Sequence, residues 1–292
     1  MTKNYLNQLL IETFVTEFKK MKIAIIGFGW LGFPLGKSLL EKGHQIVGTT
    51  TTLSKIKSLE ENGFSVVELD FSQDLPQNLN SFFEKTDICI LNFPPRRNNS
   101  NSDFRFYGEQ LLKAIQPFPA ETKFIFVSST GIYPDSISVA KEDVFNRLEL
   151  VNENHLAFAE EALYQKLKDR LTIIRMAGLI GEDRQIAKYF AGKENLPNGK
   201  TPVNLIHQKD CIGIIETIIE KQIWGEIFNA CASEHPSKEK YYTYCCEKLN
   251  LALPSYAKEE STSIFKIVDN QKSKSLLGYQ YLLDNPFDFF HK

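Results

Sequence analysis

Long apolar runs are missing from this sequence of 292 residues. No stretch approaches the roughly 18 consecutive apolar residues that a membrane-spanning helix needs. The first residues also lack the charged start, apolar centre and small-residue cleavage site of a signal peptide. Neither charge is in excess, because Lys plus Arg total 34 and Asp plus Glu total 36. The composition therefore argues against membrane and nucleic-acid partners and indicates an ordinary globular protein.

Cysteine is also scarce. The chain has five cysteines, an odd number, and no two of them have the CxxC spacing of a metal or redox site: Cys89, Cys211, Cys231, Cys245 and Cys246. We therefore expect reduced thiols, no bound metal and a cytoplasmic location.

Residues 1–20 precede the first core strand and carry apolar side chains at roughly helical spacing: Leu6, Leu9, Leu10, Val15 and Phe18. A docked amphipathic helix is one interpretation of this pattern. Met21 opens the first strand directly, as a natural start codon would, and this favours the other interpretation. We expect a dispensable N-terminal extension over 1–20.

Short β-rich runs alternate with amphipathic stretches from Met21 onward. Six of these runs are predicted strands: Lys22–Ile26, Gln45–Thr49, Ser65–Leu69, Ile88–Asn92, Lys123–Ser128 and Leu171–Met176. Such alternation predicts a parallel sheet, and nearly continuous apolar runs indicate that helices cover both of its faces. Beyond Ala177 the pattern changes to a Gly/Pro/Asn-rich stretch over 196–202 and an Ile-rich helix near 212–219. We predict an α/β fold, a doubly wound parallel Rossmann sheet over 21–177, with a smaller C-terminal α/β substrate lobe over 178–292.

A glycine motif follows the first predicted strand and leads into a predicted helix over Pro34–Lys42. It reads Gly27, Phe28, Gly29, Trp30, Leu31 and Gly32. In a dinucleotide site the first glycine makes a tight turn, the second lets a pyrophosphate approach the backbone, and the third lets helix and strand pack closely. We therefore assign these six residues to a dinucleotide site. The alternatives are a purely structural turn, or FAD or S-adenosylmethionine as the ligand.

The residues that distinguish NAD from NADP are expected about 20 positions further on, where an NAD site has a carboxylate that binds the ribose 2′-hydroxyl. This chain has Thr49 and Thr50 within a run of threonines, followed by Lys55. Hydroxyl and ammonium groups would bind a 2′-phosphate, and no carboxylate would repel it. NADP is therefore favoured over NAD, unless the threonines form only a solvent loop, which would leave the preference open.

Residues after the third and fourth strands complete the expected cofactor site, because ligands bind outside the carboxyl ends of the strands in an open α/β sheet. Asp70 is either a hydrogen-bond acceptor for the adenine amino group or a simple cap. Pro94 and Pro95 are expected to stiffen the wall beside the cofactor. Arg96 and Arg97 are either phosphate ligands or solvated surface.

The segment Val127–Pro134 resembles the extended short-chain dehydrogenases, the group that contains nucleotide-sugar epimerases and dehydratases. Further likenesses are Thr172–Gly181 to that family's sixth strand and turn, Val203–Asp210 to its IHxxD segment, and Ile227–Ala230 to the strand that returns to the sheet. The stretch Gly27–Leu35, together with the paired prolines, is most similar to the atypical YeeZ-like subgroup.

The resemblance implies an NAD(P)-dependent hydride transfer at this edge of the sheet. It places Ser129 at the position that hydrogen-bonds the reacting hydroxyl or carbonyl, with Thr130 as its neighbour and Ser128 in the cofactor site. A strand-end Ser-Ser-Thr run is otherwise read as a helix cap or turn.

The family's catalytic tyrosine and lysine, a YxxxK pair, are absent. Alignment through Ala159–Leu163 puts Asn152 in the tyrosine position and Leu156 in the lysine position. A literal YxxxK begins at Tyr164, but it lies too close to the next strand to reach the carboxyl edge of the sheet.

Two residues are candidate substitutes for the missing acid or base. Tyr133 lies beside the Ser129 segment, and His155 falls on the first turns of the helix and has a side chain suited to proton relay. Both also have structural interpretations, as a packed tyrosine and a partly exposed helix residue. We interpret His207 and Asp210 as structural, with Asp210 capping the following helix.

These observations predict an NAD(P)-binding protein of the epimerase/dehydratase type, acting as an NADP-dependent oxidoreductase or epimerase. The expected substrate is a nucleotide-sugar or another metabolite with a hydroxyl or carbonyl group. The alternative is a non-catalytic sensor of NADP(H), because the usual acid and base are missing. Pairing into a homodimer through helices of the dinucleotide domain is expected by analogy alone.

Overall fold

The computed structural model of the chain describes residues 19–95, 104–143, 149–258 and 265–290. The predicted extension at 1–20 therefore lies almost wholly outside the described residues. Arg96 and Arg97, which the sequence suggests as phosphate ligands, also lie outside them.

The centre of the fold is a seven-stranded sheet with the order β10-β7-β5-β4-β1-β2-β3, in which every neighbouring pair is parallel. The strands are β1 Lys22–Ile26, β2 Gln45–Thr50, β3 Ser65–Glu68, β4 Ile88–Leu91, β5 Lys123–Ser129, β7 Leu171–Met176 and β10 Ile227–Ala230. The order reverses direction between β1 and β4, which is the switch point where such sheets bind ligands. The predicted doubly wound parallel sheet is confirmed, and β10 returns to it beside β7 as expected.

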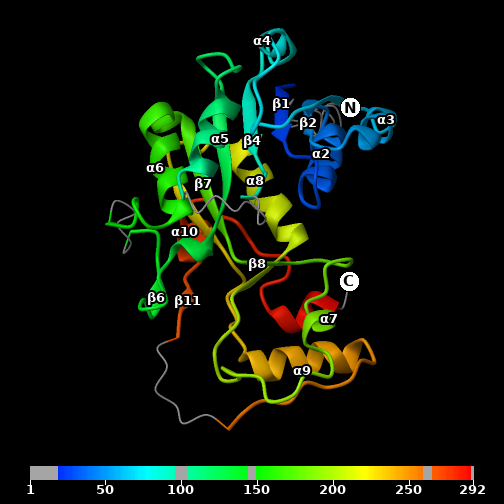
Figure 1. The fold of residues 1–292 in the computed structure, drawn as a ribbon, viewed down its shortest axis with the longest axis vertical. Coiled ribbons are helices and arrows are strands. Elements are labelled where there is room, and N and C mark those ends of the chain that lie inside the picture. Colours follow the sequence, from blue (N-terminus) through cyan, green and yellow to red (C-terminus); the bar gives the residue numbers. More distant parts are fainter. Residues whose placement is uncertain (1–18, 96–103, 144–148, 259–264, 291–292) are drawn as a thin grey trace, which may run out of the picture.

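Helices cover both faces of this sheet (Figure 1). α5 Phe106–Ile115 and α6 His155–Leu167 pack together on one face, and α2 Gly32–Glu41 lies with α8 Gln208–Lys221 on the other. Right-handed crossovers on opposite sides of the switch point place α2 and α5 on opposite faces. Shorter elements complete this part of the chain: η1 Leu53–Lys55, α3 Ile56–Glu61, α4 Leu79–Phe82, η2 Thr130–Ile132 and η4 Lys168–Arg170.

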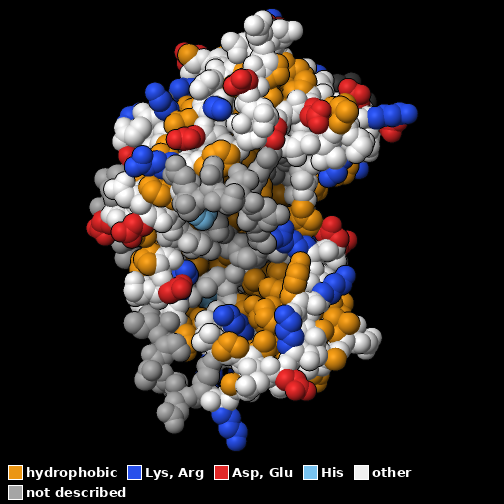
Figure 2. Space-filling model, in the orientation of Figure 1, with side chains coloured by type: hydrophobic (Ala, Val, Ile, Leu, Met, Phe, Trp, Pro, Cys, Tyr) orange, Lys and Arg blue, Asp and Glu red, His pale blue; other side chains and the backbone are white. Residues whose placement is uncertain are grey.

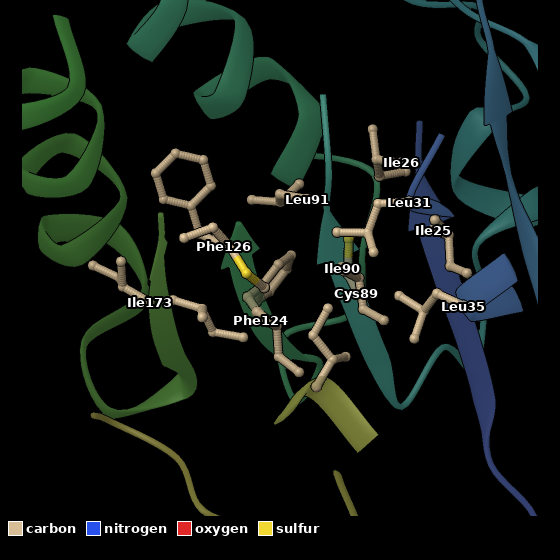
Figure 3. Close-up of a cluster of buried hydrophobic side chains, with 14 of the residues drawn as sticks. Ile25, Ile26, Leu31, Leu35, Cys89, Ile90, Leu91, Phe124, Phe126 and Ile173 are labelled. Carbon is tan, nitrogen blue, oxygen red and sulfur yellow. The ribbon is translucent and has the colours of Figure 1, made fainter. Parts of the chain in front are cut away.

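The apolar strand residues predicted to lie between helices form the main core. Figure 3 shows Ile25, Ile90, Phe124 and Phe126 among these side chains, each at most 1% exposed. Burying a side chain of this size stabilises the fold by about 1.5–3 kcal/mol. The core thus fixes the sheet whose carboxyl edge carries the candidate site.

A second apolar cluster gathers residues from position 180 onward, including Val203, Tyr241, Tyr242 and Leu283. It is built from β8 Gly178–Ile180, α7 Ala187–Phe190, β9 Leu205–His207, α9 Lys238–Lys248 and η5 Pro286–Phe290. The remaining elements are β6 Val139–Ala140 and β11 Ile267–Val268, which pair in parallel, and α10 Gln271–Ser275, which contacts β10. Figure 1 shows α7, α9 and the C-terminal end below the sheet. A separate lobe that begins at residue 178 stays a prediction.

Asp210 does not cap α8, contrary to the prediction. The cap is His207, whose Nδ1 accepts a hydrogen bond from the backbone N–H of Lys209. The Asp210 carboxylate is fully buried and instead accepts bonds from the Tyr279 hydroxyl and from the backbone N–H groups of Leu282 and Leu283. It therefore fastens the C-terminal segment to α8.

The surface shows positive and negative side chains mixed over the face seen in Figure 2. Among the described residues, no helix is long and apolar enough to cross a membrane.

Candidate dinucleotide and active site

The three glycines of the loop after β1 meet three different structural demands. Gly27 has φ +110°, and a Cβ there would lie 2.6 Å from the carbonyl oxygen of Asn92. A Cβ on Gly29 would meet no atom within 4 Å, whereas one on Gly32 would lie 2.2 Å from the carbonyl oxygen of Gly27. Gly27 therefore serves the turn and Gly32 the close packing of α2 on β1. Gly29 leaves open space beside the backbone, as a dinucleotide phosphate requires.

The loop leads into α2 with no side-chain cap and no acidic residue in the first turn. An uncapped helix N-terminus offers N–H donors and a positive dipole end to an anion. The Phe28 and Leu31 side chains belong to the buried core, so these two residues would serve a ligand through their backbone. The Trp30 side chain points elsewhere, to the segment after β8, where its Nε1 donates to Asp183 Oδ1 at 2.6 Å.

Thr49 and Thr50 end β2 beside the glycine loop, and the backbone N–H of Phe28 donates to the Thr49 carbonyl at 3.1 Å. The two threonines are only 3% and 6% exposed, and the Thr50 hydroxyl accepts a bond from the backbone N–H of Thr52. Lys55 is exposed. The exposed residues Thr51 and Thr52, with Lys55, are therefore better placed than Thr49 and Thr50 to meet a ribose substituent.

Asp70 closes a tight turn after β3, since its Oδ1 accepts bonds from both the backbone N–H and the hydroxyl of Ser72. This geometry supports the capping interpretation. Pro94 is exposed beyond β4. The preceding Phe93 stacks on Phe71, and its carbonyl accepts a bond from the Tyr107 hydroxyl at 2.7 Å, which fixes the wall next to Pro94.

A buried ion pair lies beneath the Ser128–Tyr133 segment. Arg175 on β7 and Glu160 on α6 are 1% and 0% exposed, and the guanidinium holds the carboxylate through Nε at 3.1 Å and Nη2 at 2.7 Å. The Ser128 hydroxyl donates to Glu160 Oε1 at 2.7 Å. Ser128 is therefore held by this pair, and its side chain is turned into the protein interior.

Tyr133 belongs to the same network. Arg175 Nη1 donates to its hydroxyl at 2.9 Å, and the hydroxyl donates to Asn229 Oδ1 at 2.7 Å. Burial raises the pKa of Tyr133 to about 12, although the neighbouring Arg175 charge opposes this shift. The geometry thus favours the structural interpretation of Tyr133 over its use as an acid or base.

Ser129 and Thr130 lie where β5 ends and η2 begins. The Ser129 oxygen accepts a bond from the backbone N–H of Gly131 at 3.1 Å and so caps η2. This lone-pair contact leaves the Ser129 hydroxyl proton available for a substrate oxygen. Thr130 is largely buried, at 8% exposed.

The first turn of α6 adjoins this segment, because a Cβ on Gly131 would lie 3.9 Å from Leu156 Cδ1. His155 is exposed at the first position of the helix, which Asn154 caps, and its ring lies 6.4 Å from that of Tyr107. Partial burial lowers the pKa of His155, so the neutral imidazole is favoured near pH 7. Of the two candidate substitutes, His155 is the one whose side chain is accessible.

Leu156, in the family's lysine position, is apolar and buried, and Asn152 precedes the helix. Tyr164 lies in the last turns of α6 and is 38% exposed, with Lys168 beside its ring. This is the helix end opposite to His155, as the distance argument predicts for the literal YxxxK.

Sequence reasoning did not single out Glu160, Arg175 or Asn229 as a network. One signal was present: Arg175 interrupts an otherwise apolar run, and a charged residue inside a buried strand requires a buried partner. The partner itself, 15 residues earlier on another element, carried no comparable signal.

Comparisons with known proteins agree with this architecture. The family model for the NAD-binding domain of the UDP-glucose/GDP-mannose dehydrogenase family matches residues 21–153. Among solved structures, UDP-glucuronic acid 4-epimerase from Bacillus cereus, in complex with UDP-glucuronic acid and NAD, has a TM-score of 0.71 at 18% identity over 93% of this chain and 97% of the epimerase. A conserved protein of unknown function from Silicibacter pomeroyi has a TM-score of 0.70 at 18% identity over 93% of this chain and 97% of its own.

The curated sequence relatives are more similar in sequence to this chain than the solved structures are, and they show its family. Protein YeeZ of Escherichia coli strain K12 is 30% identical over 268 residues, which cover 91% of this chain and 97% of YeeZ. The chain therefore belongs to the same family as protein YeeZ, and it shares its fold with the solved UDP-glucuronic acid 4-epimerase.

Proposed function

We propose that this chain binds NAD(P)(H) at the carboxyl edge of its sheet and acts as an oxidoreductase or epimerase on a nucleotide-sugar or a related metabolite with a hydroxyl or carbonyl group. The observation that carries the proposal is the glycine loop. Gly29 faces open space while Gly27 and Gly32 are required by the backbone around them. A bound diphosphate needs the open space at Gly29 in addition to the tight turn and close packing at Gly27 and Gly32. A purely structural turn needs no such space.

NADP remains our preferred cofactor form, with NAD as the alternative. The structural neighbour from Bacillus cereus was solved with NAD. The loop after β2 nevertheless offers exposed hydroxyls and the Lys55 ammonium, and no carboxylate stands between Thr49 and Lys55. We expect Lys55→Glu to weaken NADPH binding much more than NADH binding, because the new charge repels only the 2′-phosphate.

The chemistry proposed for the site is reversible oxidation of an alcohol carbon. The bound cofactor would accept hydride from that carbon, while the hydroxyl proton leaves to a base. Ser129, with Thr130 beside it, would orient the substrate oxygen, and His155 would take the proton as a neutral imidazole. Ser129→Ala should then lower turnover more than it weakens cofactor binding.

Titration calorimetry of the purified protein with NADPH and NADH tests the proposal. We expect NADPH to bind and Gly29→Asp to abolish binding, since a carboxylate would occupy the open space and repel the diphosphate. Gly43→Asp is the matched control, because a Cβ on Gly43 also meets no atom within 4 Å, and Gly43 lies at the far end of α2. Failure of the unaltered protein to bind either dinucleotide would refute the proposed function.

A non-catalytic NADP(H) sensor is the second candidate, and the absence of the YxxxK pair favours it. The sensor would be established if Ser129→Ala kept every cellular and biochemical effect of the unaltered protein while Gly29→Asp lost them.

We also propose a cytoplasmic homodimer. Light scattering of the purified protein would decide its oligomeric state.

A further inference from the structure

Trp30 belongs to the glycine loop, yet its side chain is held by the segment that follows β8. The indole Nε1 donates to Asp183 Oδ1 at 2.6 Å, and the guanidinium of Arg184 lies over the ring at 5.2 Å from its centroid. Cation–aromatic contact and a hydrogen bond to a charged acceptor both favour one orientation of the indole. The loop is thus tied to residues that are distant in sequence.

The fit around the indole is close. A Cβ on Gly181 would lie 2.6 Å from Trp30 Cζ2, so any larger residue there would displace the ring. The Trp30 carbonyl accepts a bond from Gln208 Nε2 at 2.8 Å, at the start of α8. Both the side chain and the backbone of Trp30 are therefore fixed from beyond residue 180.

A second set of contacts links the other end of α2 to α8. The Ser38 hydroxyl donates to Glu216 at 2.5 Å, and Lys42 pairs with both Glu216 and Glu220 at 2.7 Å. α2 is the helix whose N-terminus begins at the glycine loop. α8 therefore contacts both ends of α2, through Gln208 at the glycine loop and through Glu216 and Glu220 at the other end. A shift of the loop would require these contacts to change.

We propose that Trp30 is a positioning residue, through which the segment Gly181–Arg184 sets the conformation of the dinucleotide-binding loop. The inference rests on the proposed function. The indole is engaged by Gly181, Asp183 and Arg184, so Trp30 would act on the cofactor through its backbone, at the N-terminus of α2. The C-terminal part of the chain is then needed for full cofactor affinity without touching the diphosphate.

A double-mutant cycle of Gly181→Ala and Trp30→Phe tests this inference. The alanine methyl collides with the outer indole ring, which phenylalanine lacks. We expect Gly181→Ala to weaken dinucleotide binding about tenfold when Trp30 is present, the size expected for losing a bond to a charged group. In the double variant, where the ring at position 30 is smaller, the same change should alter affinity less than about twofold.

Gly199→Ala is the matched control. Its Cβ would lie 2.9 Å from the Tyr256 ring, a similar collision far from the glycine loop. It should lower the melting temperature as much as Gly181→Ala does, yet leave the affinity for NADPH and NADH unchanged. If Gly181→Ala and Gly199→Ala lost affinity equally, the loss would come from general destabilisation and not from Trp30, and the inference would be overturned.

The outcomes separate the two proposals. Binding by the unaltered protein with no difference among the cycle members refutes the positioning role of Trp30 and leaves the dinucleotide site intact. Absence of binding by the unaltered protein refutes the proposed function, and the inference with it. Binding that falls in Gly181→Ala and in Trp30→Phe, but no further in the double variant, supports both.

Discussion

Arg175→Met would leave the Glu160 carboxylate buried without its counter-charge. In the intact protein two guanidinium nitrogens hold that carboxylate at 2.7 and 3.1 Å, and a third holds the Tyr133 hydroxyl. Within the described residues, the donor to Glu160 that the variant keeps is the Ser128 hydroxyl. Breaking a buried pair by removing one partner typically destabilises a protein by about 3–5 kcal/mol, because an uncompensated charge remains inside.

We therefore expect Arg175→Met to lower the free energy of unfolding by about 4 kcal/mol, or roughly 10 °C in melting temperature for a chain of this size. Urea unfolding followed by circular dichroism would measure the change. Coincident transitions by circular dichroism and tryptophan fluorescence would show that the chain unfolds in a single step. Replacing both residues, as Arg175→Met with Glu160→Met, should recover most of the loss, since no buried charge then remains.

Lys272→Met provides the control. The Lys272–Glu226 pair spans 2.8 Å but its side chains are 31% and 37% exposed, so its loss should reduce stability by less than about 1 kcal/mol. The reasoning would be refuted if Arg175→Met were no more destabilising than Lys272→Met. Strict additivity of the two changes in the double variant would also contradict it, because contacting charges must show coupling.

Two further predictions concern single residues. Gly32→Ala should lower the free energy of unfolding by about 3 kcal/mol in urea titrations, because its Cβ would overlap the Gly27 carbonyl, whereas Gly29→Ala should change it by less than about 0.5 kcal/mol. Burial, and then the Lys209 charge, lower the pKa of His207, so its contribution to stability is present above about pH 6.5 and is lost as the pH falls through the folded-state pKa. The melting temperature should therefore fall less between pH 7.5 and pH 5.5 in His207→Asn than in the unaltered protein. Asparagine keeps a side-chain acceptor for the helix N-terminus. An equal fall in the two proteins would contradict this prediction.

The sheet and the cofactor loop could be predicted because their signals are local. β1 and β7 match their predicted ranges, and the other four predicted strands differ by a single residue at the C-terminal end. Apolar runs bounded by glycine and polar residues determine where a buried parallel strand starts and stops. The glycine spacing reflects the local junction of β1 and α2, so the sequence contained the information needed to find the loop; the contacts that hold Trp30 come from beyond residue 180 and were not visible in it.

The polar interactions at the carboxyl edge depend on partners that are distant in sequence, and there the predictions were weaker. Tyr133 was considered as an acid or base because it adjoins Ser129, but its hydroxyl is held by Arg175 and Asn229. Asp210 has the position of a cap, yet binds residues more than 60 positions later. Spacing along the chain reveals neither partner, because the tertiary fold alone brings them together.

The buried pair also bears on how the site could function without the family's tyrosine and lysine. Glu160 holds Ser128 and Arg175 holds Tyr133, so the segment that contains Ser129 and Thr130 is anchored on both sides. The segment is therefore held without a neighbouring lysine, and Leu156 stands in that position. The missing tyrosine leaves the site without the family's usual proton carrier, and the accessible side chain at the start of α6, His155, is the group we propose to replace it.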